Sequence, residues 1–216
     1  MTGSNRDLFD SASRNTPLGA HAWLLPRFAC PMDRSLLAEI DRIQAAAPFR
    51  HVVTPGGQRM SVAMTNCGSL GWVSDRSGYR YESRDPVSGA PWPCMPQPFL
   101  DLARCAASTA GYPGFEPDAC LINRYQPGAR MSLHQDRDEL DFANPIVSIS
   151  LGLPALFLWG GNLRSDRPQR VPLAHGDIVV WGGSARLRYH GVLAVKPGLH
   201  ELTGAQRINL TLRRAR

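Results

Sequence analysis

Residues 207–213 read Arg-Ile-Asn-Leu-Thr-Leu-Arg, a strict alternation of polar and apolar side chains. Side chains of a β-strand point alternately to opposite faces, so the pattern predicts a strand with one polar and one apolar face. An amphipathic strand with a solvated polar face fits this pattern. However, two arginines beside short polar side chains also suit the inner wall of a barrel, because arginine binds carboxylates in a bidentate manner. We therefore take Arg207, Asn209 and Arg213 as a candidate dicarboxylate site.

Further β-rich runs precede this strand and alternate with turns, at residues 146–151, 156–159 and 178–181. Short strands at such spacing are typical of an antiparallel sandwich or barrel. The sequence therefore predicts that the C-terminal half of the chain is β-structure.

Two helices are expected ahead of these strands. Leu36 and Ile40 recur at helical spacing after Asp33, which we expect to cap the first helix. The second helix is expected to begin at Pro98 and to end at Gly111, because proline suits the first helical turn and glycine the residue after the last. The predicted fold class is mainly β with flanking helices (α+β).

The length of 216 residues suits one domain. We expect a flexible N-terminal arm at residues 1–20 and a single domain at 21–216. Residues 50–97 contain many Gly, Pro, Arg and aromatic residues with little helical period, so they are expected to form strands and loops over a site. No apolar run approaches the roughly 18 residues that a membrane span needs. With no signal-peptide pattern and five scattered cysteines, the expectation is a cytoplasmic protein without a membrane segment.

The charge of the chain favours a polyanionic partner. The formal net charge is +6, and arginine supplies 23 of the 24 basic residues. Arginine pairs well with phosphate, so nucleic acid is the first candidate for that partner.

A candidate metal site begins at His134-Gln135-Asp136, since residues two apart in an extended segment share a face. His190, in Tyr-His-Gly, is the candidate third ligand. Two histidines and one carboxylate form the facial triad of non-haem Fe(II) oxygenases, which leaves sites open for a chelating co-substrate and O2. Zinc accepts the same three ligands, so the triad alone does not choose the metal. Asn123 and Tyr125, just upstream, supply another polar strand face.

Taken together, these segments resemble the AlkB family of nucleic-acid dealkylating dioxygenases. The matching stretches are TPGG at 54–57, MSVAMTNCG at 60–68, LGW at 70–72, ACLINRY at 119–125, SLHQD at 132–136, GDIVVWGG at 176–183, YHG at 189–191 and the strand at 207–213. Their order and separations match from about residue 20 onward. The resemblance implies a double-stranded β-helix (jelly-roll) core with a nucleotide-recognition lid at about residues 50–90.

The resemblance also assigns roles to individual residues. It implies that His134, Asp136 and His190 bind Fe(II), with 2-oxoglutarate and O2 as co-substrates. The implied 2-oxoglutarate contacts are Asn123, Tyr125, Arg207, Asn209 and Arg213. Which arginine takes which carboxylate stays open, and we favour Arg207 for the distal one. The implied nucleotide contacts are Trp72, which stacks on the base, Asp138, which accepts a hydrogen bond from its exocyclic amine, and Thr54, Met64, Tyr79, Tyr81 and Arg164.

The implied activity is oxidative removal of alkyl groups from bases such as 1-methyladenine and 3-methylcytosine, with release of formaldehyde, succinate and CO2. Single-stranded DNA is the expected substrate, duplex DNA and RNA are further candidates, and a monomer is the default state. Three alternatives remain open: a 2-oxoglutarate-dependent hydroxylase of a protein or small molecule, a catalytically silent nucleic-acid-binding domain, and a zinc hydrolase. A silent binding domain would leave the metal triad without a role, and a zinc hydrolase would leave the arginines of residues 207–213 without one.

Overall fold

The structure is a computed structural model that describes residues 15–216. Its helices are α1 (Asp33–Ala46) and α2 (Gln97–Thr109), with 3-10 turns η1 (Cys30–Met32) and η2 (Gly183–Ala185). Its strands are β1 (Thr16–Gly19), β2 (Ala22–Leu25), β3 (Arg50–Val53), β4 (Arg59–Gly68), β5 (Gly71–Asp75), β6 (Gly78–Glu82), β7 (Ala119–Tyr125), β8 (Met131–His134), β9 (Ile146–Gly152), β10 (Ala155–Trp159), β11 (Gln169–Leu173), β12 (Ile178–Trp181), β13 (His190–Val192) and β14 (Arg207–Arg213). Neither helix is long and apolar enough to cross a membrane.

The strands form three sheets. The largest has eight strands in the order β1-β2-β12-β9-β14-β7-β4-β3, the second has four in the order β11-β10-β13-β8, and β5 and β6 form a separate two-stranded sheet. Neighbouring strands in these sheets pair antiparallel, with β14 between β7 and β9. Two facing antiparallel sheets give the predicted jelly-roll core, and the predicted strands at residues 146–151, 156–159 and 178–181 are confirmed as β9, β10 and β12.

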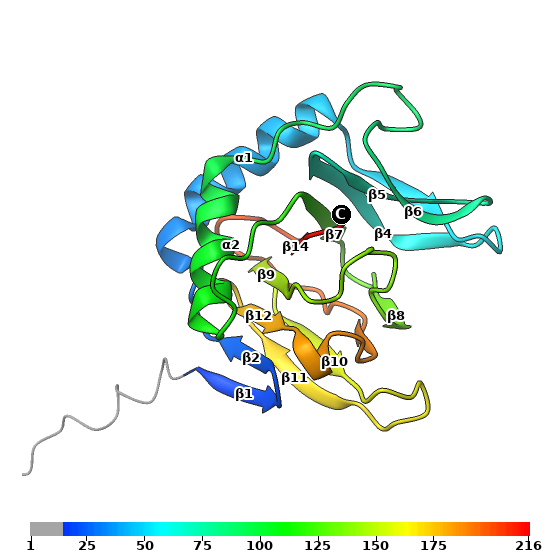
Figure 1. Cartoon of the computed structure of the whole chain (residues 1–216). Helices are drawn as coiled ribbons and strands as arrows, with labels where there is room; N and C mark the ends of the chain where they lie inside the picture. The colour runs from blue at the N-terminus through cyan, green and yellow to red at the C-terminus, as the bar shows by residue number, and fades with distance from the viewer. Residues whose placement is uncertain (1–14) are drawn as a thin grey trace, which may run out of the picture.

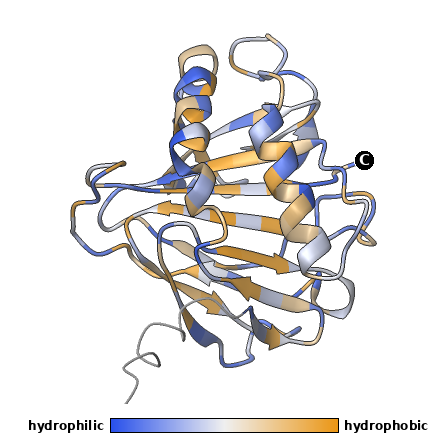
Figure 2. Cartoon of the chain, turned by 90° about the vertical axis from the view of Figure 1, so that its left-hand side faces the viewer, coloured by the Kyte–Doolittle hydropathy of each residue, from blue (hydrophilic) through white to orange (hydrophobic). Residues whose placement is uncertain are grey.

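Helices α1 and α2 pack on one face of the eight-stranded sheet (Figure 1). The side chains between them include Leu36 and Ile40 of α1 and Phe99 of α2, all at most 1% exposed. The apolar face of β14, at Ile208, Leu210 and Leu212, joins the same core. Seen from the helix side, orange strand segments lie behind the two helices (Figure 2). The alternation in β14 thus assigns one of its faces to this helix-covered core.

A second core fills the space between the eight-stranded and four-stranded sheets. Phe157 and Trp159 of β10 pack there with Trp181 of β12, with ring centroids 5.9–6.2 Å apart. The indole nitrogen of Trp159 donates a hydrogen bond to the Leu18 carbonyl in β1 at 3.0 Å. This aromatic cluster supports the strands that carry the polar site residues.

Two sequence predictions need correction. Asp33 is the first residue of α1 rather than its cap, because η1 runs directly into the helix and places Met32 at the N-cap position. The Asp33 carboxylate lies 3.1 Å from the Nε2 atom of His175 instead. The predicted arm at residues 1–20 lies largely outside the described residues, but β1 (Thr16–Gly19) pairs with β2, so the folded domain begins before residue 21. Helix α2 is confirmed with Pro98 in its first turn, and Gly111 follows it with φ +91°.

Candidate functional site

The predicted metal ligands converge at one end of the four-stranded sheet. His134 ends β8 and His190 begins β13, and the two residues are directly paired across these strands. Asp136 lies two residues beyond the end of β8. One ligand atom from each of the three lies within 4.8 Å of the other two. The predicted convergence of these residues is therefore confirmed.

Hydrogen bonds fix which nitrogen of each histidine can bind a metal. The Nδ1 atom of His134 lies 2.9 Å from the Ser132 carbonyl, and that of His190 lies 3.0 Å from the Arg188 carbonyl. A carbonyl can only accept, so both Nδ1 atoms carry the proton and both Nε2 atoms are free to donate to a metal. These Nε2 atoms lie 3.6 and 3.7 Å from the Asp136 carboxylate.

His190 and Asp136 are in the protonation states that metal ligands require. Burial and the neighbouring His134 lower the pKa of His190 to about 4, so its imidazole is neutral at pH 7. Burial alone would raise the pKa of Asp136, but Arg213, His190 and His134 lower it well below its ordinary value. Metal ligands must be deprotonated, so this site needs no proton release from Asp136 at neutral pH.

Arg213 holds Asp136 directly. Its Nε and Nη2 atoms donate to the Oδ2 atom of Asp136 at 3.0 and 2.6 Å. The side chains are 7% and 8% exposed. Arg213 was predicted to contact the co-substrate, and in the structure its principal partner is this metal ligand.

A cavity of about 630 Å³ extends from the metal ligands between the two large sheets and under the β5–β6 hairpin. It is lined by all but one of the predicted site residues. These are His134, Asp136, His190, Asn123, Tyr125, Arg207, Asn209, Arg213, Trp72, Tyr79, Asp138, Arg164, Thr54 and Met64. Segments far apart in the sequence therefore meet in one space.

The polar face of β14 forms one wall of this cavity. Arg207 is 1% exposed, and its Nη2 atom donates to the Ser150 hydroxyl at 2.9 Å. Within residues 15–216, its Nε and Nη1 atoms have no hydrogen-bond partner. Burial lowers the pKa of this guanidinium. A buried arginine with two unpaired donors is costly unless an anion pairs with it, so this wall suits a carboxylate.

Asn209 stands beside Arg207 on the same wall. Its amide donates to the Ser148 hydroxyl at 2.8 Å and to the Ile149 carbonyl at 3.0 Å. The side-chain nitrogen of Asn123, from β7, lies 3.5 Å from the side-chain oxygen Oδ1 of Asn209. These contacts orient the Asn209 amide, and both amides line the cavity.

Trp72 and Asp138 both line the cavity, and their side chains are in direct contact. The indole nitrogen of Trp72 donates to the Oδ2 atom of Asp138 at 2.8 Å. Tyr79, across the hairpin, stacks on the Trp72 ring with centroids 5.4 Å apart. The Trp72 ring, which the sequence predicts to stack on a base, is thus held by contacts with Asp138 and Tyr79.

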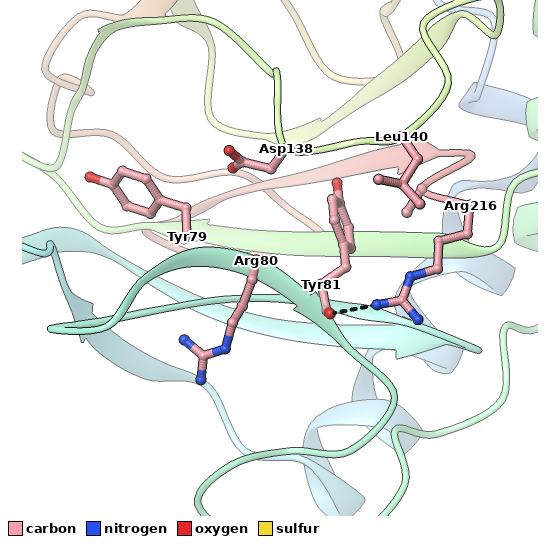
Figure 3. A pocket seen from close by; sticks show the side chains of 7 residues that line it. Tyr79, Arg80, Tyr81, Asp138, Leu140 and Arg216 are labelled. Atoms are coloured by element: carbon pink, nitrogen blue, oxygen red, sulfur yellow. Dashed lines mark hydrogen bonds between the residues drawn. The ribbon is translucent and has the colours of Figure 1, made fainter.

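Tyr81 is the predicted site residue that does not line this cavity. Tyr79 and Tyr81 rise from the same side of β6, but Tyr81 is 6% exposed and lies beside Arg216 (Figure 3). Its hydroxyl donates to the Oε1 atom of Glu139 at 2.7 Å. Tyr81 therefore contacts a buried acid, and it lines a neighbouring cavity together with Tyr79 and Asp138. Its contact with a nucleotide stays a prediction. Burial raises the pKa of this phenol well above its ordinary value.

Sequence reasoning missed several polar residues that complete the site. Ser148 and Ser150 alternate with apolar residues along β9, a period-two signal that could have placed them on the cavity wall. Glu139 and Arg186 gave no such signal, because their ion pair at 3.1 Å joins a loop to the end of η2.

Exposed arginines surround the mouth of the cavity. Arg59, Arg130, Arg137 and Arg164 all line it, and all four are exposed. They come from β4 and from loops on both sides of the metal ligands. This rim suits a chain of phosphates that passes across the opening.

Together, the residues fit an Fe(II) centre with a dicarboxylate co-substrate. Two imidazoles and a carboxylate are the ligand set of such centres, and the buried arginine beside them matches a second carboxylate. A zinc hydrolase would need the triad alone and would leave the β14 wall unexplained.

Comparisons with known proteins agree with this geometry. Residues 21–213 match the model of the 2OG-Fe(II) oxygenase superfamily. The chain is 57% identical over 210 residues to the alpha-ketoglutarate-dependent dioxygenase AlkB of Salmonella typhimurium, covering 97% of both chains. It is 34% identical over 128 residues to the mouse nucleic acid dioxygenase ALKBH1, covering 59% of this chain and 33% of that protein. Among solved structures, that of OsALKBH1 superposes with a TM-score of 0.81 at 26% identity, over 93% of this chain and all of that one.

Proposed function

The chain belongs to the 2OG-Fe(II) oxygenase superfamily and is an Fe(II)- and 2-oxoglutarate-dependent dioxygenase of the AlkB type, and from this premise we propose that it removes alkyl groups from damaged bases in single-stranded DNA. The observation that carries the proposal is one cavity that joins three parts. These are the metal ligands, the aromatic and acidic groups at Trp72 and Asp138, and a rim of exposed arginines.

His134, Asp136 and His190 would hold the iron, and the β14 wall would hold 2-oxoglutarate. Arg207 is the better partner for the distal carboxylate, because two of its donors are unpaired while Arg213 is bound to Asp136. Bound iron supplies the oxidation of the alkyl carbon by O2, coupled to conversion of 2-oxoglutarate into succinate and CO2. The hydroxylated methyl group then leaves the base nitrogen as formaldehyde.

Trp72 and Asp138 would position the base. The indole offers a flat face for stacking, and Asp138 offers a carboxylate for the exocyclic amine and for the positive charge of 1-methyladenine or 3-methylcytosine. The His134 ring, 39% exposed, lies across the cavity as the second face. Thr54, Met64, Tyr79 and Arg164 line the same space and are the remaining proposed contacts.

The expected substrate is single-stranded because the alkylated nitrogens lie on the pairing edge of the base. An enzyme reaches that edge only when the base is unpaired or flipped out, which costs a few kcal/mol in a duplex. The arginine rim would bind the flanking phosphates without regard to sequence. We further propose a monomer that acts in the cytoplasm, where reducing conditions suit its five free cysteines.

The test is anaerobic reconstitution with Fe(II) and 2-oxoglutarate, followed by O2 and oligonucleotides that carry 1-methyladenine or 3-methylcytosine. Formaldehyde and succinate should form in equal amounts, faster on single-stranded than on duplex DNA. An unmethylated oligonucleotide of the same sequence is the control. Succinate release that requires a peptide or small molecule, and not the methylated oligonucleotide, would instead support a hydroxylase of another substrate class.

A further inference from the structure

A buried network of charged side chains adjoins the metal ligand Asp136. Its four members are Asp136, Glu139, Arg186 and Arg213, whose side chains are at most 8% exposed. The network comes from three separate parts of the chain: the loop after β8, the end of η2 and the last residue of β14. Burial of four charges in contact requires close compensation, because desolvation of each charge is costly.

Glu139 pairs with both arginines. Its Oε2 atom lies 3.1 Å from the Nη2 atom of Arg186, and its Oε1 atom lies 3.3 Å from the Nε atom of Arg213. Each arginine also contacts Asp136: Arg186 donates to its main-chain carbonyl at 2.7 Å, and Arg213 donates to its carboxylate at 2.6 Å. Glu139 is thus joined to the metal ligand through two guanidinium groups.

The charges of the network sum to zero. Arg186 and Arg213 each contribute +1, and Asp136 and Glu139 each contribute −1. Without the charge of Glu139, the other three groups, Asp136 included, would carry a net charge of +1 at the place where a divalent cation has to bind. In a buried site with low effective dielectric, like charges a few ångströms apart repel strongly.

We propose that Glu139 is a positioning residue that neutralises the two buried arginines, so that they orient Asp136 without repelling the metal ion. The proposal rests on the His-Asp-His metal site and concerns its affinity for a dication. Arg213 fixes the direction of the Asp136 carboxylate, and Glu139 removes the electrostatic cost of that arrangement.

The same carboxylate connects the β5–β6 hairpin to the metal centre. The Tyr81 hydroxyl donates a hydrogen bond to Glu139 at 2.7 Å. Tyr81 is also the direct cross-strand partner of Trp72. Asp138, the residue before Glu139, accepts the indole proton of Trp72. Two consecutive acids therefore hold the two members of one cross-strand pair. Glu139 accordingly serves the metal side and the substrate side of the cavity together.

The test is titration of the purified apoprotein with Co(II), followed by the visible absorption of the bound ion. Glu139→Gln preserves the shape of the side chain and removes its charge. Loss of such outer groups typically weakens metal affinity by about 10- to 100-fold, and we expect a loss in that range. Glu139→Asp keeps the charge and should retain more of the affinity. Tyr81→Phe removes one hydrogen bond and no charge, so it should cost less than Glu139→Gln.

The decisive variant is the double substitution Glu139→Gln with Arg186→Gln, which restores the sum of charges to zero. It should recover most of the Co(II) affinity that Glu139→Gln loses, whereas a merely structural role for Glu139 predicts a further loss. Circular dichroism on each variant checks that it is folded. If Glu139→Gln alone does not fold, the double variant carries the test, and weak Co(II) binding by a folded double variant overturns the proposal.

Equal Co(II) affinity in Glu139→Gln and wild type also overturns the proposal and leaves the dealkylase function intact. Failure of the wild-type protein itself to bind Co(II) would instead refute the metal site on which that function depends. The two failures are therefore distinguishable without any nucleic-acid substrate.

Discussion

The indole Nε1 atom of Trp72 donates a hydrogen bond to the Oδ2 atom of Asp138 at 2.8 Å. One oxygen of the acid that is proposed to read the base is thereby engaged by the ring that is proposed to stack on it. The hydrogen bond sets the plane of the indole and the direction of the carboxylate together. Stacking and charge recognition are consequently linked, and substitutions can separate them.

Replacement of Trp72 by alanine should raise KM for a methylated oligonucleotide. Loss of base stacking costs about 1–3 kcal/mol, which corresponds to about 5- to 150-fold in KM. Co(II) affinity should stay at the wild-type value, because Trp72 does not contact the metal ligands. Trp72→Phe keeps a ring but loses the N–H donor, so its KM should lie between that of wild type and that of Trp72→Ala. Unchanged KM in Trp72→Ala would remove this residue from the binding site.

Replacement of Asp138 by asparagine should lower kcat/KM on cationic bases such as 1-methyladenine. Loss of a hydrogen bond to a charged group costs about 1.5–3 kcal/mol, so the decrease should be roughly tenfold or more. The asparagine can still accept from Trp72, so the stacking surface is retained. A neutral alkylated base serves as the comparison in steady-state kinetics. An equal decrease on cationic and neutral bases would argue against a charge-recognition role.

Replacement of Arg207 by lysine should raise the 2-oxoglutarate concentration needed for half-maximal succinate release. Lysine keeps the charge but cannot bind a carboxylate in a bidentate manner, so we expect a cost of about 1.5–3 kcal/mol. Asn209 and Ser150 remain in place. Because Arg207 does not contact the metal ligands, Co(II) titration should give the wild-type affinity. A variant that loses Co(II) binding as strongly as 2-oxoglutarate binding would show that the substitution acts by disrupting the fold.

Replacement of Gly191 by alanine should weaken metal binding although Gly191 offers no ligand atom. A Cβ atom there would lie 2.7 Å from the Met131 carbonyl oxygen in β8, which is backbone and cannot swing aside. Strands β8 and β13 would separate, and His190 would move relative to His134. Outer changes of this kind cost about 10- to 100-fold in metal affinity. Gly56→Ala is the matched control, since its Cβ would have only the Thr54 hydroxyl within 4 Å, at 3.8 Å.

Replacement of Asp85 by asparagine should lower the free energy of unfolding at pH 7 by about 1–3 kcal/mol. Asp85 is 4% exposed and accepts from Arg50 at 2.8 Å and from Ser88 at 3.0 Å. Burial alone would raise its pKa, but the Arg50 guanidinium and nearby hydrogen-bond donors hold it below the ordinary value. A lowered folded pKa stabilises the fold above the unfolded pKa of about 4, and that contribution is lost as the pH falls further.

Chemical denaturation at pH 7 and at pH 3 measures this difference. The difference in the free energy of unfolding between wild type and Asp85→Asn should be large at pH 7 and smaller at pH 3. Asp101→Asn is the control, because its ion pair with Arg104 is 3.6 Å long and exposed on both sides. Such surface pairs contribute about 0–1 kcal/mol. A gap for Asp85→Asn that does not change with pH would contradict the electrostatic origin.

The alternation in β14 allowed the sequence to predict both its core face and its cavity face. Side-chain direction in a strand depends on local backbone geometry, so seven residues sufficed. For Tyr81, the same rule predicted the strand face but not the partner. Tyr81 shares a strand face with Tyr79, but two residues along a strand span about 6.6 Å, enough to carry the second ring beyond the cavity. The contact of Tyr81 with Glu139 depends on how the hairpin docks, which no local pattern records.

No sequence pattern predicts the network around Glu139. Its ion pair with Arg186 joins residues from two loops, and loops carry no periodic signal. The metal triad was predictable because His134 and Asp136 share one face of an extended segment, and because the segments around all three ligands resemble those of the AlkB family. The balance of charge around it was not, because every arginine in a basic chain is an equal candidate.

The two-stranded β5–β6 sheet shares no strand with either large sheet. The Trp72 stacking surface and the metal ligands are thus built on separate sheets that meet at one opening. A change in the hairpin can therefore alter the surface offered to a base while the metal ligands stay on the four-stranded sheet and the loop after β8. Tyr81 sets the limit on this freedom, since a transplanted hairpin must still deliver a hydroxyl to Glu139.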